Sequence, residues 1–194
     1  SIVALEYVDG VLLVASNASS LFKLGEVYDR IGFAGTGKFS EFDQLRKIGV
    51  RFADSKGYAY SREDVRAKGL ADEFSRLVGD IFAHETKPLE VELLVVEIGD
   101  DRYDDHKKNS LYKIRYDGFV SDHSGYCVIG GDIAAVESKL DAEYFGEPSL
   151  RDAVRLASDA LDTTDLEVCV LDRDGTGRRF TRLDDSRVQG FLGE

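Results

Sequence analysis

Hydrophobic and polar residues follow a strand-like pattern at the start of the chain. Two apolar runs, 2–8 and 11–15, flank the pair Asp9-Gly10. Aspartate followed by glycine tolerates the positive backbone angles of a tight turn, so the chain is predicted to open with a β-hairpin. A further short strand is predicted over 28–35, where apolar residues lead into a glycine-rich bend.

The apolar spacing then becomes helical in two successive segments. Ser40 is a candidate N-cap for the first predicted helix. In the second, Ser61 stands three residues before Asp64, which resembles a capping box, and Lys87-Pro88 ends the pattern. The apolar positions are 42, 45, 49, 52 and 53 in the first helix, and 70, 74, 77, 78 and 81 in the second.

The second half of the chain repeats this order of strands followed by helices. Helical spacing recurs over 133–140, and Ser149 with Asp152 is a second capping signal, here for a helix that carries apolar residues up to Ala160. A short tail, 186–192, is also predicted to be helical. Strands are predicted over 89–98, 112–116, 126–129, 166–171 and 179–183.

The order of these elements predicts the fold. Strands come in groups and helices in pairs, which favours antiparallel sheets covered by helices over alternating parallel units. We therefore expect an α/β fold of the α+β kind, a four-layer αββα sandwich of two antiparallel sheets between helix pairs. The 194 residues contain no low-complexity linker, so one domain over 1–194 is expected.

Composition excludes several classes of function. The formal net charge is −12, and a nucleic-acid binder needs clustered Lys and Arg instead. No apolar run has the length of a membrane span and no signal-peptide pattern opens the chain, so neither a membrane nor export is expected. The two cysteines, Cys127 and Cys169, lie in apolar runs, which indicates buried free thiols and a cytoplasmic location.

A phosphate-binding loop is the first candidate for chemistry. Residues 32–38 have its glycine spacing and end in Lys38. Phe39 follows, where such a loop needs a Ser or Thr hydroxyl to hold magnesium. We therefore interpret the segment as a turn between strand and helix.

Metal sites are also weakly indicated. Asp172, Asp174 and Gly177 resemble a calcium loop, but Leu183 stands where a bidentate glutamate is required. Consecutive loop carboxylates repel one another and stay hydrated, and isolated histidines lack ligand spacing. No metal and no cofactor are expected. The groups considered were the loop acids Asp100, Asp101, Asp104 and Asp105 with His106, and the isolated His84 and His123.

An N-terminal nucleophile is the serious enzymatic alternative. A strand that begins at Ser1 places a hydroxyl beside its own α-amine, which would serve as the base. Such a site needs an acid and a lysine nearby. The strand end at Ser16 offers no acid, and Asp29-Arg30 stands where we expect the lysine, so the sequence argues against catalysis.

The sequence closely resembles α-type subunits of actinobacterial 20S proteasomes over essentially its whole length. The motif that first carries the resemblance is Tyr28-Asp29-Arg30-Ile31-Gly32-Phe33-Ala34. The others are Ser1 to Tyr7, Gly37-Lys38-Phe39, Phe52-Ala53-Asp54, Gly57-Tyr58-Ala59-Tyr60, Lys87-Pro88-Leu89-Glu90-Val91-Glu92, Tyr116-Asp117-Gly118, Gly130-Gly131 and Leu166-Glu167-Val168.

The resemblance implies a non-catalytic ring subunit with the N-terminal nucleophile hydrolase-like proteasome fold. Members form seven-membered rings that cap catalytic β rings, and they carry an N-terminal gate segment that this sequence is expected to lack. Catalytic relatives have an N-terminal Thr, with Asp and Lys at positions expected near Ser16 and Arg30. Hexameric ATPase activators dock C-terminal tails between α subunits, and the resemblance assigns the carboxylate to Lys23, with Gly37 lining the same pocket.

The sequence departs from the family at two places. Residues 16–19 read Ser-Asn-Ala-Ser where members often have Glu-Asn-Pro-Ser, and the loop over 100–108 is unusually acidic and then basic. We expect these differences to affect the preference for activators and to leave the fold unchanged.

Overall fold

The computed structural model describes residues 1–17, 21–100, 108–174 and 176–193. The strands are β1 (Ile2–Tyr7), β2 (Gly10–Ser16), β3 (Leu24–Tyr28), β4 (Ile31–Gly37), β5 (Val91–Glu97), β6 (Ser110–Ile114), β7 (Val120–His123), β8 (Tyr126–Ile129), β9 (Leu166–Asp172) and β10 (Phe180–Arg182). The helices are α1 (Phe39–Ala59), a 3₁₀ turn η1 (Arg62–Asp64), α2 (Ala67–His84), α3 (Ile133–Glu143), α4 (Leu150–Leu161) and α5 (Asp185–Leu192).

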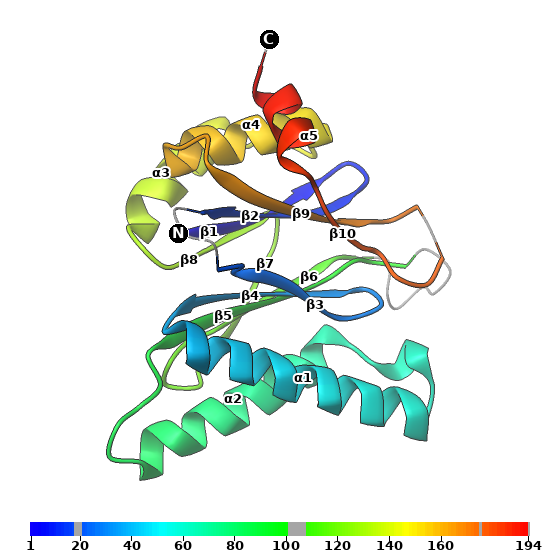
Figure 1. Ribbon diagram of the computed structural model, residues 1–194, viewed down its shortest axis with the longest axis vertical. Helices are drawn as coiled ribbons and strands as arrows, with labels where there is room; N and C mark the ends of the chain where they lie inside the picture. The colour runs from blue at the N-terminus through cyan, green and yellow to red at the C-terminus, as the bar shows by residue number, and fades with distance from the viewer. Residues whose placement is uncertain (18–20, 101–107, 175, 194) are drawn as a thin grey trace.

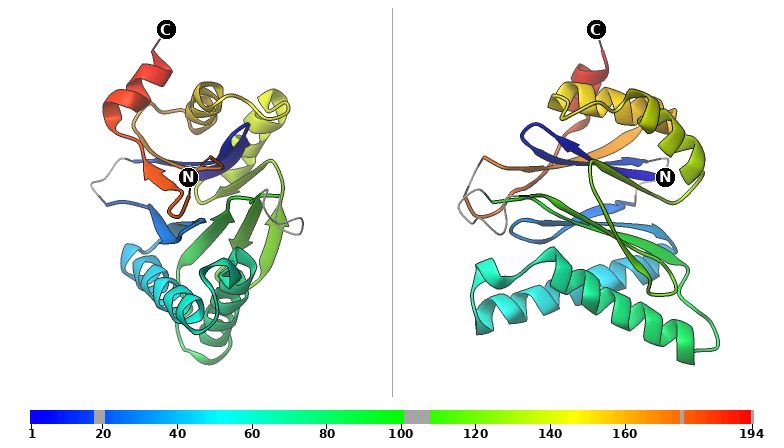
Figure 2. Two further views of the ribbon diagram at one scale, coloured as in Figure 1. Left: turned by 90° about the vertical axis from the view of Figure 1, so that its right-hand side faces the viewer. Right: turned by 180° about the vertical axis from the view of Figure 1, so that it is seen from behind.

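The strands form two antiparallel sheets that stack face to face. One has the order β10-β9-β2-β1-β8 and the other β3-β4-β5-β6-β7. Helices α3, α4 and α5 cover the outer face of the first sheet, and α1 and α2 cover that of the second (Figure 1). The side views in Figure 2 show the same four layers. The predicted αββα sandwich is therefore confirmed, with α5 as a third helix in one outer layer.

Buried apolar residues fill the three spaces between these layers, and β1 contributes to two of them. Val3 and Leu5 pack in the cluster under α3, α4 and α5, whereas Ile2 and Ala4 pack between the two sheets. Both faces of β1 are buried. Its sequence is therefore a continuous apolar run and does not alternate between apolar and polar residues. The third cluster lies between the second sheet and α1 with α2.

One local signal in the sequence is confirmed in part and one in full. The predicted hairpin joins β1 to β2, but Tyr7 pairs with Gly10, so the loop is Val8-Asp9, and neither Asp9 nor Gly10 has the positive φ that the prediction assumed. Ser149 is the N-cap of α4, and its hydroxyl oxygen accepts a hydrogen bond from the backbone N–H of Asp152 at 3.2 Å.

The single strand predicted over 28–35 is wrong. This segment contains the end of β3, a turn at Asp29 and Arg30, and most of β4. Strand β3 escaped prediction because Gly25 and Glu26 interrupt its apolar pattern, as they can on an edge strand that is partly exposed. The short edge strand β7 was missed in the same way.

Two predicted helix starts also need correction. Ser40 lies inside α1, whose N-cap is Lys38 and has no side-chain capping bond. Ser61 caps η1 instead of α2. Helix α2 begins at Ala67, and its N–H donates to a carboxylate oxygen of buried Glu97 on β5 at 2.9 Å. A helix start can be satisfied by a residue distant in sequence, which a local motif does not reveal.

No helix in the described ranges is long and apolar enough to cross a membrane.

Candidate functional site

A polar corner forms where the first strand begins and the second ends. Ser1 precedes β1 and faces Ser16 at the end of β2, because the hairpin register brings these termini together. The Ser16 backbone N–H donates to the Ser1 carbonyl oxygen at 3.2 Å. The Ser1 α-amine donates to the Ser16 hydroxyl at 3.3 Å. Burial, followed by the positive charge of Lys23, lowers the pKa of this amine below its ordinary value.

Lys23 brings a positive charge into this corner. Its ammonium donates to the backbone carbonyl of Ser16 at 2.6 Å. Its backbone carbonyl accepts a hydrogen bond from the N–H of Gly35 on β4 at 3.1 Å. Within the described ranges, no carboxylate lies within ion-pair distance of the ammonium. Two of its three N–H donors therefore have no protein acceptor there.

A buried carboxylate fixes the backbone at Lys23. Glu167 on β9 accepts hydrogen bonds from the N–H groups of Lys23 at 2.8 Å and Leu24 at 3.1 Å. It also forms an ion pair with Arg182 on β10. Sequence reasoning did not assign Glu167 to the site, although a charged residue within the apolar run of β9 was the available signal.

The expectation that Arg30 occupies the lysine position of a nucleophile site is wrong. Arg30 lies in the turn after β3, at the opposite end of that strand from Lys23. There it is buried and pairs with Asp100 at 3.1 Å and Glu97 at 3.4 Å. The lysine that lies near Ser1 is Lys23. Among the described residues, no carboxylate contacts Ser1.

Gly37 lies at the same end of the molecule as Lys23, at the end of β4. Its φ is +97°, and a Cβ there would lie 1.9 Å from the carbonyl oxygen of Glu90, so the backbone requires glycine. Gly37 lines a mainly apolar cavity of about 490 Å³ together with Leu89, Tyr116 and Gly131. Lys23 does not line this cavity.

The phosphate-loop-like and calcium-loop-like motifs of the sequence are parts of the sheets and their connections. Residues 32–37 are part of β4, and a Cβ on Gly32 would lie 3.0–3.1 Å from side chains on three neighbouring strands, so this segment is sheet instead of a phosphate loop. The carboxylate of Asp172, from the calcium-like motif, accepts a hydrogen bond from the Tyr7 hydroxyl. The calcium-like motif therefore belongs to the connection between β9 and β10.

The remaining metal candidates do not come together. His84 contacts the carbonyl of Asp80, and His123 contacts the Ser121 hydroxyl at 2.8 Å. No cluster of three metal-ligating side chains exists among the residues that the structure describes. The loop acids 101, 104 and 105 with His106, and residues 18–19 of the departing motif, lie outside that part.

The fold and this corner define a class: proteins with the proteasome-type αββα sandwich, in which the first strand starts beside a lysine. The sequence model described as "Proteasome subunit" matches residues 1–175. The chain therefore belongs to the proteasome subunit family.

Curated relatives narrow the comparison. A protein named proteasome subunit alpha from Mycobacterium sp. (strain KMS) is 43% identical over 205 residues, covering 99% of this chain and 81% of the relative. Its namesake from Acidimicrobium ferrooxidans is 45% identical, covering 95% and 82%. That from Mycobacterium tuberculosis (strain ATCC 25177 / H37Ra) is 43% identical, covering 99% and 83%. The α-type resemblance is confirmed.

Proposed function

We propose that this chain is the non-catalytic α subunit of a cytoplasmic 20S proteasome core. One domain over 1–194 forms heptameric outer rings that stack on catalytic β rings and gate the passage of substrates to them. The observation that carries this proposal is 43–45% identity, over nearly the whole chain, to proteins named proteasome subunit alpha. Peptide hydrolysis then belongs to the β subunits.

We further propose that Lys23 binds the C-terminal carboxylate of a hexameric ATPase activator. The ammonium has no ion pair within the described ranges and keeps two N–H donors available. It is partly buried, which strengthens its attraction for a carboxylate over that of a fully hydrated lysine. Glu167 fixes its backbone, so the charge is presented from a defined position. Gly37 contributes from a neighbouring surface of the pocket.

Reconstituted core particles test the docking proposal. In particles that carry Lys23→Ala, we expect ATPase-dependent degradation of a folded protein to fall by about tenfold, the loss of roughly one charge-assisted contact. Cleavage of a short fluorogenic peptide should stay unchanged, because it needs no activator. Lys47→Ala, at an exposed lysine paired with Asp43 on α1, is the matched control. Unchanged protein degradation by the Lys23 variant would refute the docking site.

Hydrolysis by Ser1 is the second candidate function, and the position of Lys23 favours it. An N-terminal nucleophile site needs a free α-amine as its base and a lysine nearby. Here Lys23 lies close to the α-amine of Ser1, whose pKa is lowered. The acid is missing from the described contacts of Ser1, so we rank this function second. It requires that Ser1 carries a free amine. The isolated chain would then cleave peptides and lose that activity in Ser1→Ala, whereas the ring-subunit proposal expects no cleavage by either form.

A further inference from the structure

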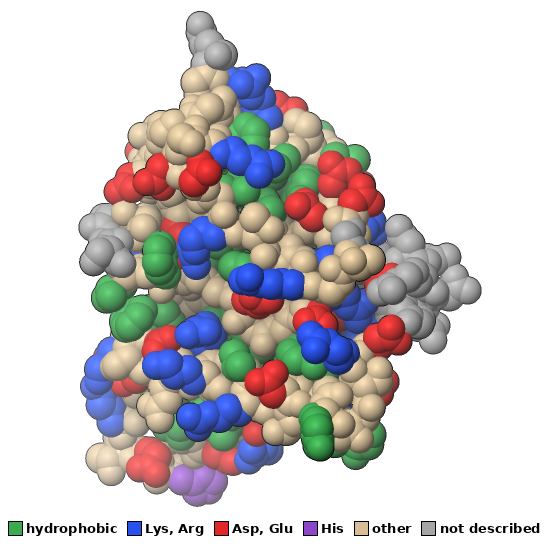
Figure 3. All heavy atoms as spheres, turned by 45° about the vertical axis from the view of Figure 1, so that its right-hand side comes forward, with side chains coloured by type: hydrophobic (Ala, Val, Ile, Leu, Met, Phe, Trp, Pro, Cys, Tyr) green, Lys and Arg blue, Asp and Glu red, His purple; other side chains and the backbone are tan. Residues whose placement is uncertain are grey.

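A second cavity lies at the other end of β3, beside the turn to β4. It has a volume of about 200 Å³, and its lining includes Tyr28, Asp29, Arg30, Arg62, Glu63 and Arg179. Three of these six residues are arginines, in a chain whose formal net charge is −12. Lys and Arg side chains also gather along the middle of the face shown in Figure 3.

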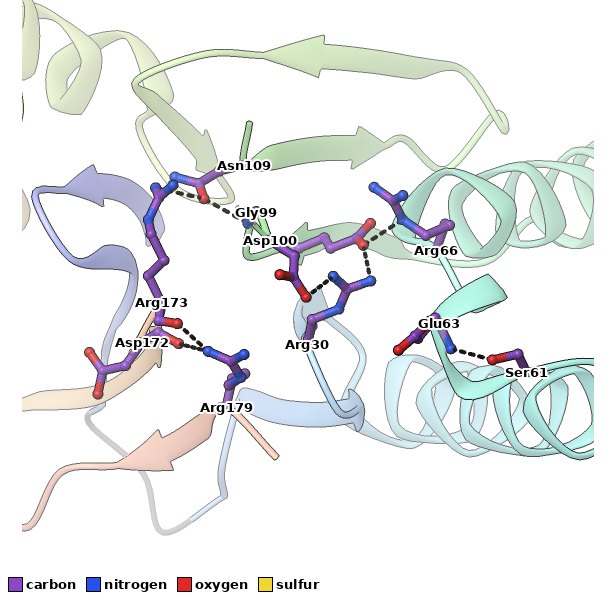
Figure 4. A network of polar contacts seen from close by, with 11 residues as sticks. Arg30, Ser61, Glu63, Arg66, Gly99, Asp100, Asn109, Asp172, Arg173 and Arg179 are labelled. Carbon is purple, nitrogen blue, oxygen red and sulfur yellow. Dashed lines mark hydrogen bonds and ion pairs between the residues drawn. The ribbon is translucent and has the colours of Figure 1, made fainter. Parts of the chain in front are cut away.

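Arg179 is the unusual residue of this cavity. It is only 8% exposed, and its Nη1 donates to the backbone carbonyl oxygens of Asp172, at 3.3 Å, and Arg173 (Figure 4). Its Nε is buried without an acceptor. In the part of the chain that the structure describes, no carboxylate forms an ion pair with it. Burying a charged group without a counter-ion is costly, so this guanidinium favours an anion beside it.

The other arginines of the cavity are already neutralised. Arg30 pairs with Glu97 and Asp100, and Arg62 binds both carboxylate oxygens of Asp29, at 2.8 and 2.5 Å.

Arg66 extends the same network from just outside the cavity. Its Nε donates to Glu97 at 2.6 Å, but its Nη1 is buried without an acceptor. Arg30, Arg62 and Arg66 therefore share the three carboxylates of Asp29, Glu97 and Asp100, and within the described ranges Arg179 pairs with none of them. Glu63 lies exposed at the rim and forms no ion pair within the described ranges, so it does not neutralise Arg179.

We propose that this cavity binds a small oxyanion, with a carboxylate or phosphate group held by Arg179. Guanidinium groups present several N–H donors in a geometry that matches both oxyanions. The volume is sufficient, since one water molecule occupies about 30 Å³. Because Arg179 has no described carboxylate partner, a ligand beside it should be negatively charged, and the cavity has room for one such group.

Calorimetric titration of the full chain at constant ionic strength tests the proposal. The probes are sodium phosphate and sodium acetate, with sodium chloride as the reference. We expect one saturable site for phosphate, acetate or both, and the stronger probe identifies the class of oxyanion. Arg179→Lys should weaken binding by about tenfold, because lysine loses the planar donor set. Arg178→Lys, at an exposed neighbour paired with Glu26, should change it less than about twofold.

Circular dichroism would show whether Arg179→Lys is folded. If it is not, a second variant still tests the proposal. Glu63→Gln removes a negative charge from the exposed rim and should tighten binding by about twofold to fivefold. In wild-type protein, the ligand should also shift the Nε–H NMR signal of Arg179 with the same saturation curve. Heats no larger than those of chloride, or full affinity in a folded Arg179→Lys variant, would overturn the proposal.

Discussion

The carboxylate of Glu167 on β9 accepts a hydrogen bond from the backbone N–H of Lys23 at 2.8 Å. Glu167 belongs to the first sheet, and Lys23 lies directly before β3 of the second. A buried charge in one sheet therefore fixes where the other sheet begins. The same contact determines where the Lys23 ammonium is presented.

Glu167→Gln should destabilise the fold by about 2 kcal/mol, because Arg182 loses its buried partner and one backbone N–H loses a charged acceptor. Denaturant unfolding of the purified chain measures this change. Glu26→Gln is the control, since Glu26 pairs with the exposed Arg178 and should cost less than about 1 kcal/mol. Equal effects of the two substitutions would contradict the buried role of Glu167.

Gly37→Ala should cost about 2 kcal/mol or more, because alanine at a φ of +97° is strained and its Cβ meets the Glu90 carbonyl at 1.9 Å. Thermal unfolding measures the loss. Gly190 in α5 is the matched control, as a Cβ there has nothing within 4 Å. Gly190→Ala should stabilise the helix by up to about 1 kcal/mol. A neutral Gly37→Ala would show that this backbone relaxes.

His123 should make stability depend on pH. Burial, followed by the charge of Lys113, lowers its pKa in the folded state below the ordinary value of 6.5. The unfolded state then binds more protons, so the contribution of His123 is complete above about pH 6.5 and is lost as the pH falls below it. Denaturant midpoints at pH 7.5 and 5.5 should differ less in His123→Gln than in the wild type. An identical difference in both would exclude this contribution.

The two thiols should be unreactive in the folded protein. Burial raises the pKa of Cys127 and of Cys169 to about 12, so neither forms the nucleophilic thiolate at pH 8. A chromogenic disulfide reagent should label neither until denaturant is added. Ser55→Cys, at an exposed position of α1, is the positive control and should react at once. Rapid labelling of the wild-type chain would mean that β8 or β9 opens readily.

Much of the secondary structure could be predicted because its signals are local. The β1–β2 hairpin and the Ser149 cap depend on a few neighbouring residues, and both form as expected, although the hairpin loop is Val8-Asp9 instead of Asp9-Gly10. Strand β3 and the start of α2 were misjudged for the opposite reason. Strand β3 gains its order from pairing with β4, and α2 begins at Ala67 because Glu97 from β5 accepts its N–H.

The candidate site shows the same division. Lys23 was assigned through the resemblance, because a motif is a property of sequence, and its docking role stays a prediction. Arg30 was misplaced because sequence distance does not show that the turn carries it to the far end of β3. The role of Glu167 was not recognised because Lys23 and Leu24, whose N–H groups donate to it, lie more than 140 positions away in sequence.

The sequence by itself determined the layers, since the period of apolar residues decides which segments become strands or helices and which faces must be buried. It also determined the family, through motifs that run along the whole chain. Only the tertiary structure decided which charges meet: Lys23 beside Ser16, and Arg179 without a described carboxylate partner. Contacts between side chains depend on how the two sheets stack, and that packing brings together residues that no local pattern connects.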